Sequence, residues 1–265
     1  MRRAASAFQL LLPLLLLSLP LSGAASAAPL GYPWMIPGDT SHEALSHRFP
    51  APPGYTRVPL ARGEFGAWLR ELPLEPAGTA VRLFDGKEKP RQDVHLAVVA
   101  IDVGDRDLQQ CADAVMRLRS EFLLARGQTI VFHPDPKKKL HTMLFDPRIP
   151  DPNRKRFHRY LTTLFSEAGS ASLQAEMAQA TAPAQPGDVL IQGGYPGHAI
   201  LVVDEVVDPG GKRKLMLAQS YMPAQQIHLL KAADGTPWFD EAALDKGGLK
   251  TPEWRPFHRK DVRRF

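Results

Sequence analysis

The 265-residue chain contains a single cysteine, Cys111, so an internal disulfide is excluded. It also lacks the H-E-x-x-H pattern of zinc hydrolases, a C-x-x-C pair, a phosphate-binding G-x-x-x-x-G-K loop and the glycine fingerprint of dinucleotide-binding domains. Three histidines in the proline-rich middle, His133, His141 and His158, are too scattered to suggest metal ligands. We therefore expect neither a metal ion nor a cofactor.

The first 27 residues have the layout of a secretory signal peptide. Arg2 and Arg3 form a basic start, a leucine-rich run follows, and A-S-A at 25–27 is a small-residue cleavage site. The apolar run is short for a membrane span and is interrupted by prolines. We expect an exported protein, periplasmic or extracellular, with no stable membrane span after cleavage. An uncleaved anchor is the alternative.

The charge balance gives little reason to expect a nucleic-acid partner. There are 33 lysines and arginines against 28 acidic residues, a formal charge of +5 that falls to +3 without Arg2 and Arg3. So mild an excess is compatible with an anionic cell wall but does not indicate nucleic-acid binding.

The mature chain is predicted to be one α+β domain with an extended lead-in. Residues 28–58 are rich in proline and turn-forming residues, which predicts an extended segment rather than a separate domain. Residues 59–265 alternate between helical and strand patterns and are long enough to bury a core of their own.

The clearest helix begins near Asp105 or Asp107, either of which can cap it, and ends at Gly127. After a second helical region, apolar runs bounded by glycine and proline predict a β region. Its three strands are expected at 188–192, 198–207 and 213–221.

Cys111 lies near the start of the clearest helix and on its apolar stripe. A helix N-terminus carries partial positive charge and free amide protons, and both favour a thiolate over a thiol. A lone thiol in an oxidising space is a liability unless it is buried or used. Cys111 is therefore a candidate nucleophile, and a small buried apolar residue is the alternative.

His198 opens an otherwise apolar strand, and a buried imidazole there needs a partner. A backbone carbonyl is the ordinary solution. The preceding Gly193, Gly194 and Gly197 allow a sharp turn and would leave open space beside the ring, which a catalytic base requires. We therefore predict a substrate cleft at these glycines and Tyr195.

Gln219 is predicted to lie on the same face as His198. The strands at 198–207 and 213–221 must pair antiparallel, and an odd register sum of 417 or 419 puts Gln219 opposite His198 or Ile200. Its carbonyl oxygen would accept a ring proton and fix the tautomer. An even register would offer Ser220 instead, and a solvated role for Gln219 is the alternative.

In chain order these residues resemble the NlpC-type branch of papain-like cysteine peptidases. The motifs that carry the resemblance are Q-Q-C-A-D-A-V, Q-P-G-D-V-L-I-Q-G-G, P-G-H-A-I-L-V-V-D and L-M-L-A-Q-S-Y. The resemblance implies that Cys111 is the nucleophile, His198 the base and Gln219 the orienting residue. The mature chain as a whole resembles a bacterial family described only as domain of unknown function 4846.

The resemblance implies a papain-like α+β fold, with helices on one face of a small antiparallel sheet. The expected function is an exported cysteine hydrolase, a peptidase or amidase acting on peptidoglycan or another envelope peptide. Gln92, Gln110 or Ser220 could support the site or an oxyanion. A non-catalytic envelope-binding module on the same scaffold is the alternative function.

Overall fold

The computed structural model describes residues 31–135, 141–181 and 183–265. The expected signal peptide lies outside the described residues. Within them, five α-helices accompany the strands: α1 (Leu45–Arg48), α2 (Phe65–Arg70), α3 (Cys111–Ala125), α4 (Lys155–Glu167) and α5 (Ser170–Ala175). Three 3-10 turns are also present: η1 (Pro152–Arg154), η2 (Glu241–Leu244) and η3 (Arg259–Asp261).

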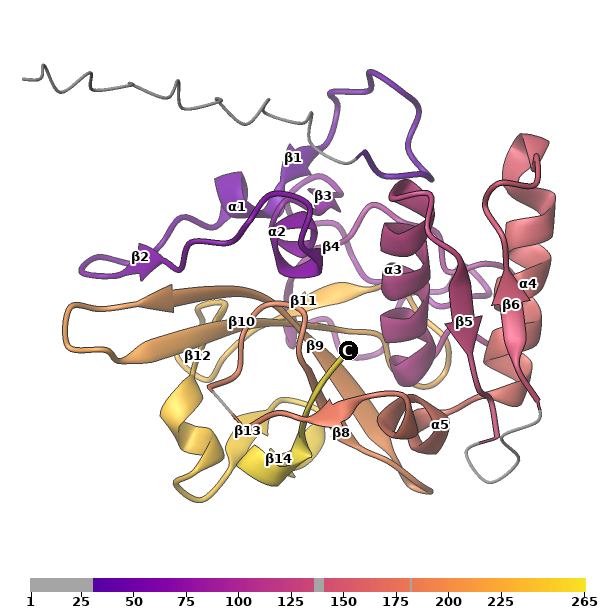
Figure 1. Ribbon diagram of the computed structural model, residues 1–265. Helices are drawn as coiled ribbons and strands as arrows, with labels where there is room; N and C mark the ends of the chain where they lie inside the picture. The colour runs from indigo at the N-terminus through magenta and orange to yellow at the C-terminus, as the bar shows by residue number, and fades with distance from the viewer. Residues whose placement is uncertain (1–30, 136–140, 182) are drawn as a thin grey trace, which may run out of the picture.

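A nine-stranded antiparallel sheet dominates the molecule (Figure 1). The order along it is β4-β11-β10-β9-β8-β15-β7, with β12 also paired to β10 and β2 to β9. The strands are β2 (Thr56–Arg57), β4 (His95–Val98), β7 (Ala178–Gln179), β8 (Val189–Gln192), β9 (His198–Val207), β10 (Arg213–Gln219), β11 (His228–Leu230), β12 (Trp238–Asp240) and β15 (Val262–Arg264).

Three two-stranded sheets surround the main one. They are β1 (Glu43–Ala44) with β3 (Pro73–Leu74), β5 (Ile130–Phe132) with β6 (Met143–Phe145), and β13 (Leu249–Thr251) with β14 (Trp254–Phe257). The predicted mixed α+β class is confirmed, but the main sheet is larger than the small sheet expected. The extra strands β2, β7 and β15 have two or three residues each, too few for an alternating pattern to reveal them.

Strand β9 separates two hydrophobic cores. Ala199, Leu201 and Val203 face a core that contains the apolar residues of α2 and α3. Ile200 and Val202 face a second core that contains Phe257 of β14 and Leu249 of β13. Figure 1 shows α2 and α3 on one side of the sheet and β13–β14 on the other. The alternation read from the sequence therefore predicts both faces of β9 at its N-terminal end.

A bulge changes this alternation at Val203. Met216 of β10 pairs with Asp204, whereas the next residue, Leu217, pairs with Val202, so Val203 is the extra residue in β9. Past the bulge, Val206 faces the helix-side core and Asp204 points toward the same side.

Asp204 fastens two N-terminal segments to β9. Its fully buried carboxylate accepts hydrogen bonds of 2.6 Å from Nε of Arg57 in β2 and 2.6 Å from Nε of Arg70 in α2. The described part of the lead-in expected at 28–58, residues 31–58, is thus joined to the body through β2. No helix in the described ranges combines the length and hydrophobicity needed to cross a bilayer.

Candidate functional site

The three predicted catalytic residues stand at the ends of three elements. Cys111 is the first residue of α3, His198 the first of β9 and Gln219 the last of β10. Helix α3 begins four residues beyond Asp107, the later of the two caps expected. The N-cap position is Gln110, and Asp107 Oδ1 instead accepts the amide of Ala224 at 2.7 Å.

Hydrogen bonds fix the start of α3 beside the end of β10. Asp113 accepts the amide of Gln110 at 3.0 Å and so satisfies one of the free donors at the helix start. Ser220 Oγ donates to the carbonyl of Gln109 at 3.0 Å and lies 2.8 Å from the carbonyl of Gln225. Ser220 therefore joins the two chain segments that carry Cys111 and Gln219.

The sulfur of Cys111 lies where β9 and β10 separate. The last residue pair between these strands is Ala218 with Leu201, so the backbone of Ala199 has no partner in β10. The Cys111 side chain interacts with this backbone of Ala199, the residue that follows His198. The sulfur thus approaches the first peptide of β9 from the α3 side, whereas the His198 ring lies on the opposite side, with Ile200 and β14.

The environment of the thiol is less activating than its position at a helix start suggests. Cys111 is only 6% exposed. Burial raises the pKa of the Cys111 thiol, and the backbone interaction with Ala199 only partly opposes this shift. The expectation of a favoured thiolate is therefore wrong in direction for the resting protein, because desolvation outweighs the helix N-terminus.

His198 and Gln219 form the predicted side-chain pair. His198 Nε2 lies 2.9 Å from Gln219 Oε1, and an amide oxygen can only accept, so Nε2 carries the proton and donates. Nδ1 of His198 is then unprotonated, and this buried nitrogen has no hydrogen-bond partner. No hydrogen bond therefore joins the ring to Cys111.

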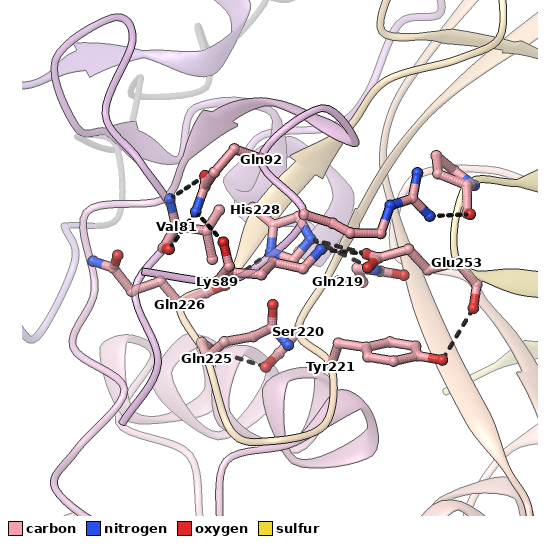
Figure 2. Close-up of polar contacts among 12 residues, drawn as sticks. Val81, Lys89, Gln92, Gln219, Ser220, Tyr221, Gln225, Gln226, His228 and Glu253 are labelled. Carbon is pink, nitrogen blue, oxygen red and sulfur yellow. Dashed lines mark hydrogen bonds and ion pairs between the residues drawn. The ribbon is translucent and has the colours of Figure 1, made fainter. Parts of the chain in front are cut away.

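The pair belongs to a polar row that crosses four adjacent strands. Gln192 of β8 is the register partner of His198, and His228 of β11 is the register partner of Gln219. Directly paired residues share one face of a sheet, so these four side chains follow each other along its edge. Figure 2 shows the Gln219 and His228 end of the row.

Aromatic rings enclose His198. Trp254 of β14 lies 4.8 Å away between ring centroids, Tyr221 5.1 Å and Phe257 6.3 Å. Burial lowers the pKa of His198 to about 4, although its hydrogen bond with Gln219 acts in the opposite direction. Thiol and imidazole are therefore both neutral at rest near neutral pH.

This depressed pKa predicts a loss of stability in acid. The folded protein keeps His198 neutral down to a pKa of about 4, while the unfolded chain binds a proton near the ordinary value of 6.5. Stability from this residue is therefore complete above about 6.5 and falls by about 3 kcal/mol as the pH drops to about 4. Urea unfolding of wild type and His198→Gln across this range measures it. Equal slopes in both proteins would contradict the assignment.

The other predicted supporting residues have different roles. The amide nitrogen of Gln92 donates to the carbonyls of Val81 and Lys89, and its oxygen accepts the amide of Val81 (Figure 2). Both amide protons of Gln92 are therefore used within that loop and are not directed at an oxyanion. The Gln110 side chain donates to Asp107 at 3.0 Å, next to the first turn of α3.

The glycine loop before His198 packs on α5 at Gly193 and Gly197. A Cβ on Gly197 would lie 2.1 Å from Ser170 Oγ, and a Cβ on Gly193 would lie 2.8 Å from the side chain of Gln174. These two glycines permit close packing of the loop on the helix. Open space remains at Gly194, where a Cβ would meet no atom within 4 Å, and Tyr195 is fully exposed.

Sequence reasoning missed several members of the polar region. Gln192 could have been found, because the predicted strands 188–192 and 198–207 allow it to pair with His198. Glu253 forms a hydrogen bond with Gln219 and an ion pair with Lys89 (Figure 2), and no strand pattern in the sequence indicated either residue. Their segments are loops whose positions depend on tertiary packing. In the described part of the chain, no cluster of three or more His, Cys, Asp or Glu residues could hold a metal ion.

The comparison with family models identifies the chain. The model described as domain of unknown function (4846) matches residues 45–141 and 140–264. The chain belongs to this family. No curated protein and no solved structure matches it. For this member of the domain of unknown function 4846 family, the arrangement of side chains is thus the main basis for a functional proposal.

Proposed function

We propose that the protein is an exported cysteine hydrolase that cleaves an amide bond. The observation that carries the proposal is the state of His198: its Nε2 donates to Gln219, and its buried Nδ1 remains a free acceptor. Cys111 at the start of α3 reaches the next backbone position, Ala199. Nucleophile, base and orienting residue thus come from three elements that meet at one edge of the sheet.

The reaction follows from these groups. Nδ1 of His198 takes the thiol proton, and the thiolate of Cys111 attacks the carbonyl carbon. The C–N bond breaks as Nδ1–H of the imidazolium protonates the leaving amine. Water, deprotonated by the same nitrogen, then hydrolyses the thioester and restores the thiol. Because the two side chains lie on opposite faces of β9 and no hydrogen bond joins them at rest, the reaction requires a rearrangement on substrate binding that brings sulfur and ring together.

The start of α3 can supply the oxyanion site. The first amides of a helix have no intrahelical acceptor and point along its positive end. In α3 the amide of Cys111 itself is the donor that we assign to this role. Developing negative charge on the carbonyl oxygen would be stabilised there, as oxyanion donors require.

The proposed substrate is a peptide of the cell envelope, such as the peptide part of peptidoglycan. Two features support it: the secretory layout of residues 1–27, which predicts a periplasmic or extracellular protein, and the mild positive charge of the mature chain. The order cysteine helix, histidine strand and polar strand also supports a papain-like arrangement of the NlpC type as the finer description of the fold.

A non-catalytic envelope-binding module is the second candidate. The observation that favours it is the neutral resting pair, since burial raises the pKa of Cys111 and lowers that of His198. An inactive descendant of a hydrolase would tolerate such a neutral pair, because binding does not require a thiolate.

Acyl transfer from p-nitrophenyl acetate separates the two candidates. In the hydrolase, Cys111 of the folded protein accepts the acetyl group with release of p-nitrophenolate, and His198→Ala slows this step by about 100-fold or more. Mass spectrometry of proteolytic peptides locates the acetyl group. Acetylation of Cys111 that is detected only after unfolding in urea would reject the hydrolase and leave the binding module.

A further inference from the structure

The protonation pattern of His198 depends on how the Gln219 amide is oriented. An amide can rotate by half a turn and present either oxygen or nitrogen to the ring. With oxygen toward His198, the ring proton stays on Nε2 and Nδ1 is free to act as a base. With nitrogen toward His198, the proton moves to Nδ1 and the base is lost.

Glu253 determines this orientation from the far side of Gln219. Its Oε2 lies 2.9 Å from Gln219 Nε2 (Figure 2). A carboxylate only accepts hydrogen bonds, so the amide nitrogen must face Glu253 and the amide oxygen must face His198. Tyr221 Oη donates to the carbonyl of Glu253 at 3.0 Å, which holds the backbone of this residue in place.

Lys89 keeps Glu253 ionised. Nζ of Lys89 lies 2.6 Å from Glu253 Oε2, and the two side chains are only 4% and 8% exposed. Burial alone would raise the pKa of Glu253, but hydrogen bonds from His228 and Lys89 and the charge of Lys89 bring it below its ordinary value. Burial lowers the pKa of Lys89, and the ion pair offsets part of that shift.

His228 is compatible with the same orientation. Its Nδ1 donates to the carbonyl of Gln226 at 2.9 Å, and its Nε2 lies 3.5 Å from Gln219 Nε2 and 3.9 Å from Glu253 Oε2. In the neutral tautomer protonated on Nδ1, this Nε2 can accept from the amide. The requirement that the amide nitrogen face this side therefore comes from Glu253.

We propose that Glu253, held by Lys89, is a positioning residue that sets the tautomer of His198 through the Gln219 amide. This inference rests on the proposed function and adds a hydrogen-bonded relay to its site. The relay runs from Lys89 through Glu253 and Gln219 to His198, and it leaves the base nitrogen facing away from the relay. Neutralising Glu253 removes the requirement that the amide nitrogen face it, because a neutral amide or acid can donate as well as accept.

The test is two-bond proton–nitrogen NMR of protein labelled with nitrogen-15 in histidine. The His198 signals are assigned by their loss in His198→Ala. Wild type should show a single tautomer protonated on Nε2, and Glu253→Gln should add the tautomer protonated on Nδ1. Lys89→Met should also introduce it, increasingly as Glu253 becomes protonated at lower pH. Acetyl transfer to Cys111 should slow by about 10- to 100-fold in Glu253→Gln, as for loss of an orienting neighbour.

Glu241→Gln is the matched control, because the side chain of Glu241 is 9% exposed, against 8% for Glu253, and is also paired with a cation, Arg259. It should leave the tautomer unchanged. An unchanged tautomer in both Glu253→Gln and Lys89→Met would overturn the inference, even if acetyl transfer still depended on His198. A changed tautomer in a protein that never acetylates Cys111 would support the relay and reject only the hydrolase.

Discussion

Cys111→Ala is expected to lower the rate of acyl hydrolysis by at least about 1,000-fold, because loss of the nucleophile removes the covalent route entirely. His198→Ala should cost a similar factor. The double variant should be no slower than either single variant, because both residues act in one step. Steady-state release of p-nitrophenolate and mass spectrometry of digested cell-wall peptides measure the effect.

His133→Ala is the control for a histidine replacement, because His133 is partly exposed and pairs with Glu176. It should leave hydrolysis unchanged, and circular dichroism should confirm that all variants are folded. Turnover that persists in Cys111→Ala would remove this residue from the mechanism. Additive losses in the double variant would show that Cys111 and His198 act separately.

The second large effect is expected from Asp204→Asn. This replacement leaves the guanidinium groups of Arg57 and Arg70 beside a neutral amide in a buried site. Removing one partner of a buried ion pair usually costs about 3–5 kcal/mol in the free energy of unfolding. Urea unfolding at neutral pH should show this loss.

Asp93→Asn provides a matched control, because Asp93 also pairs with an arginine but its side chain is 68% exposed. Its replacement should change the unfolding free energy by no more than about 1 kcal/mol, the range for surface pairs. Similar losses in the two variants would show that Asp204 does not have the special stabilising role assigned to it.

The local order of the site could be predicted from the sequence. Alternation in β9 placed His198 on the face of Ile200, and an odd register placed Gln219 on that face as well. The structure has the 419 sum at Leu217–Val202 and Ala218–Leu201, next to the site. Short-range patterns suffice here, because adjacent strands joined by a tight turn have few alternative registers.

The electrostatics and the surroundings could not be predicted in the same way. The position of Cys111 at a helix start predicts a lowered thiol pKa. The burial that raises this pKa instead depends on residues that β9 and β10 bring next to the helix. In the sequence, Gly193 and Gly197 are equally compatible with a loop packed closely on another segment and with open space beside His198. Only the position of α5 in the fold shows that the loop packs closely. Glu253 reaches Gln219 from a segment whose sequence contains no strand or helix signal of comparable strength.

The extra residue at Val203 has a consequence for the chemistry at the far end of β9. Near the turn, β9 and β10 pair with a register sum of 420, and continuing it would set Ser220 opposite Ile200. A serine hydroxyl both donates and accepts, so it would tolerate either tautomer of the imidazole. The extra residue Val203, five positions from His198, therefore places Gln219 rather than Ser220 on the face of the imidazole. The amide of Gln219, unlike a hydroxyl, can favour one tautomer.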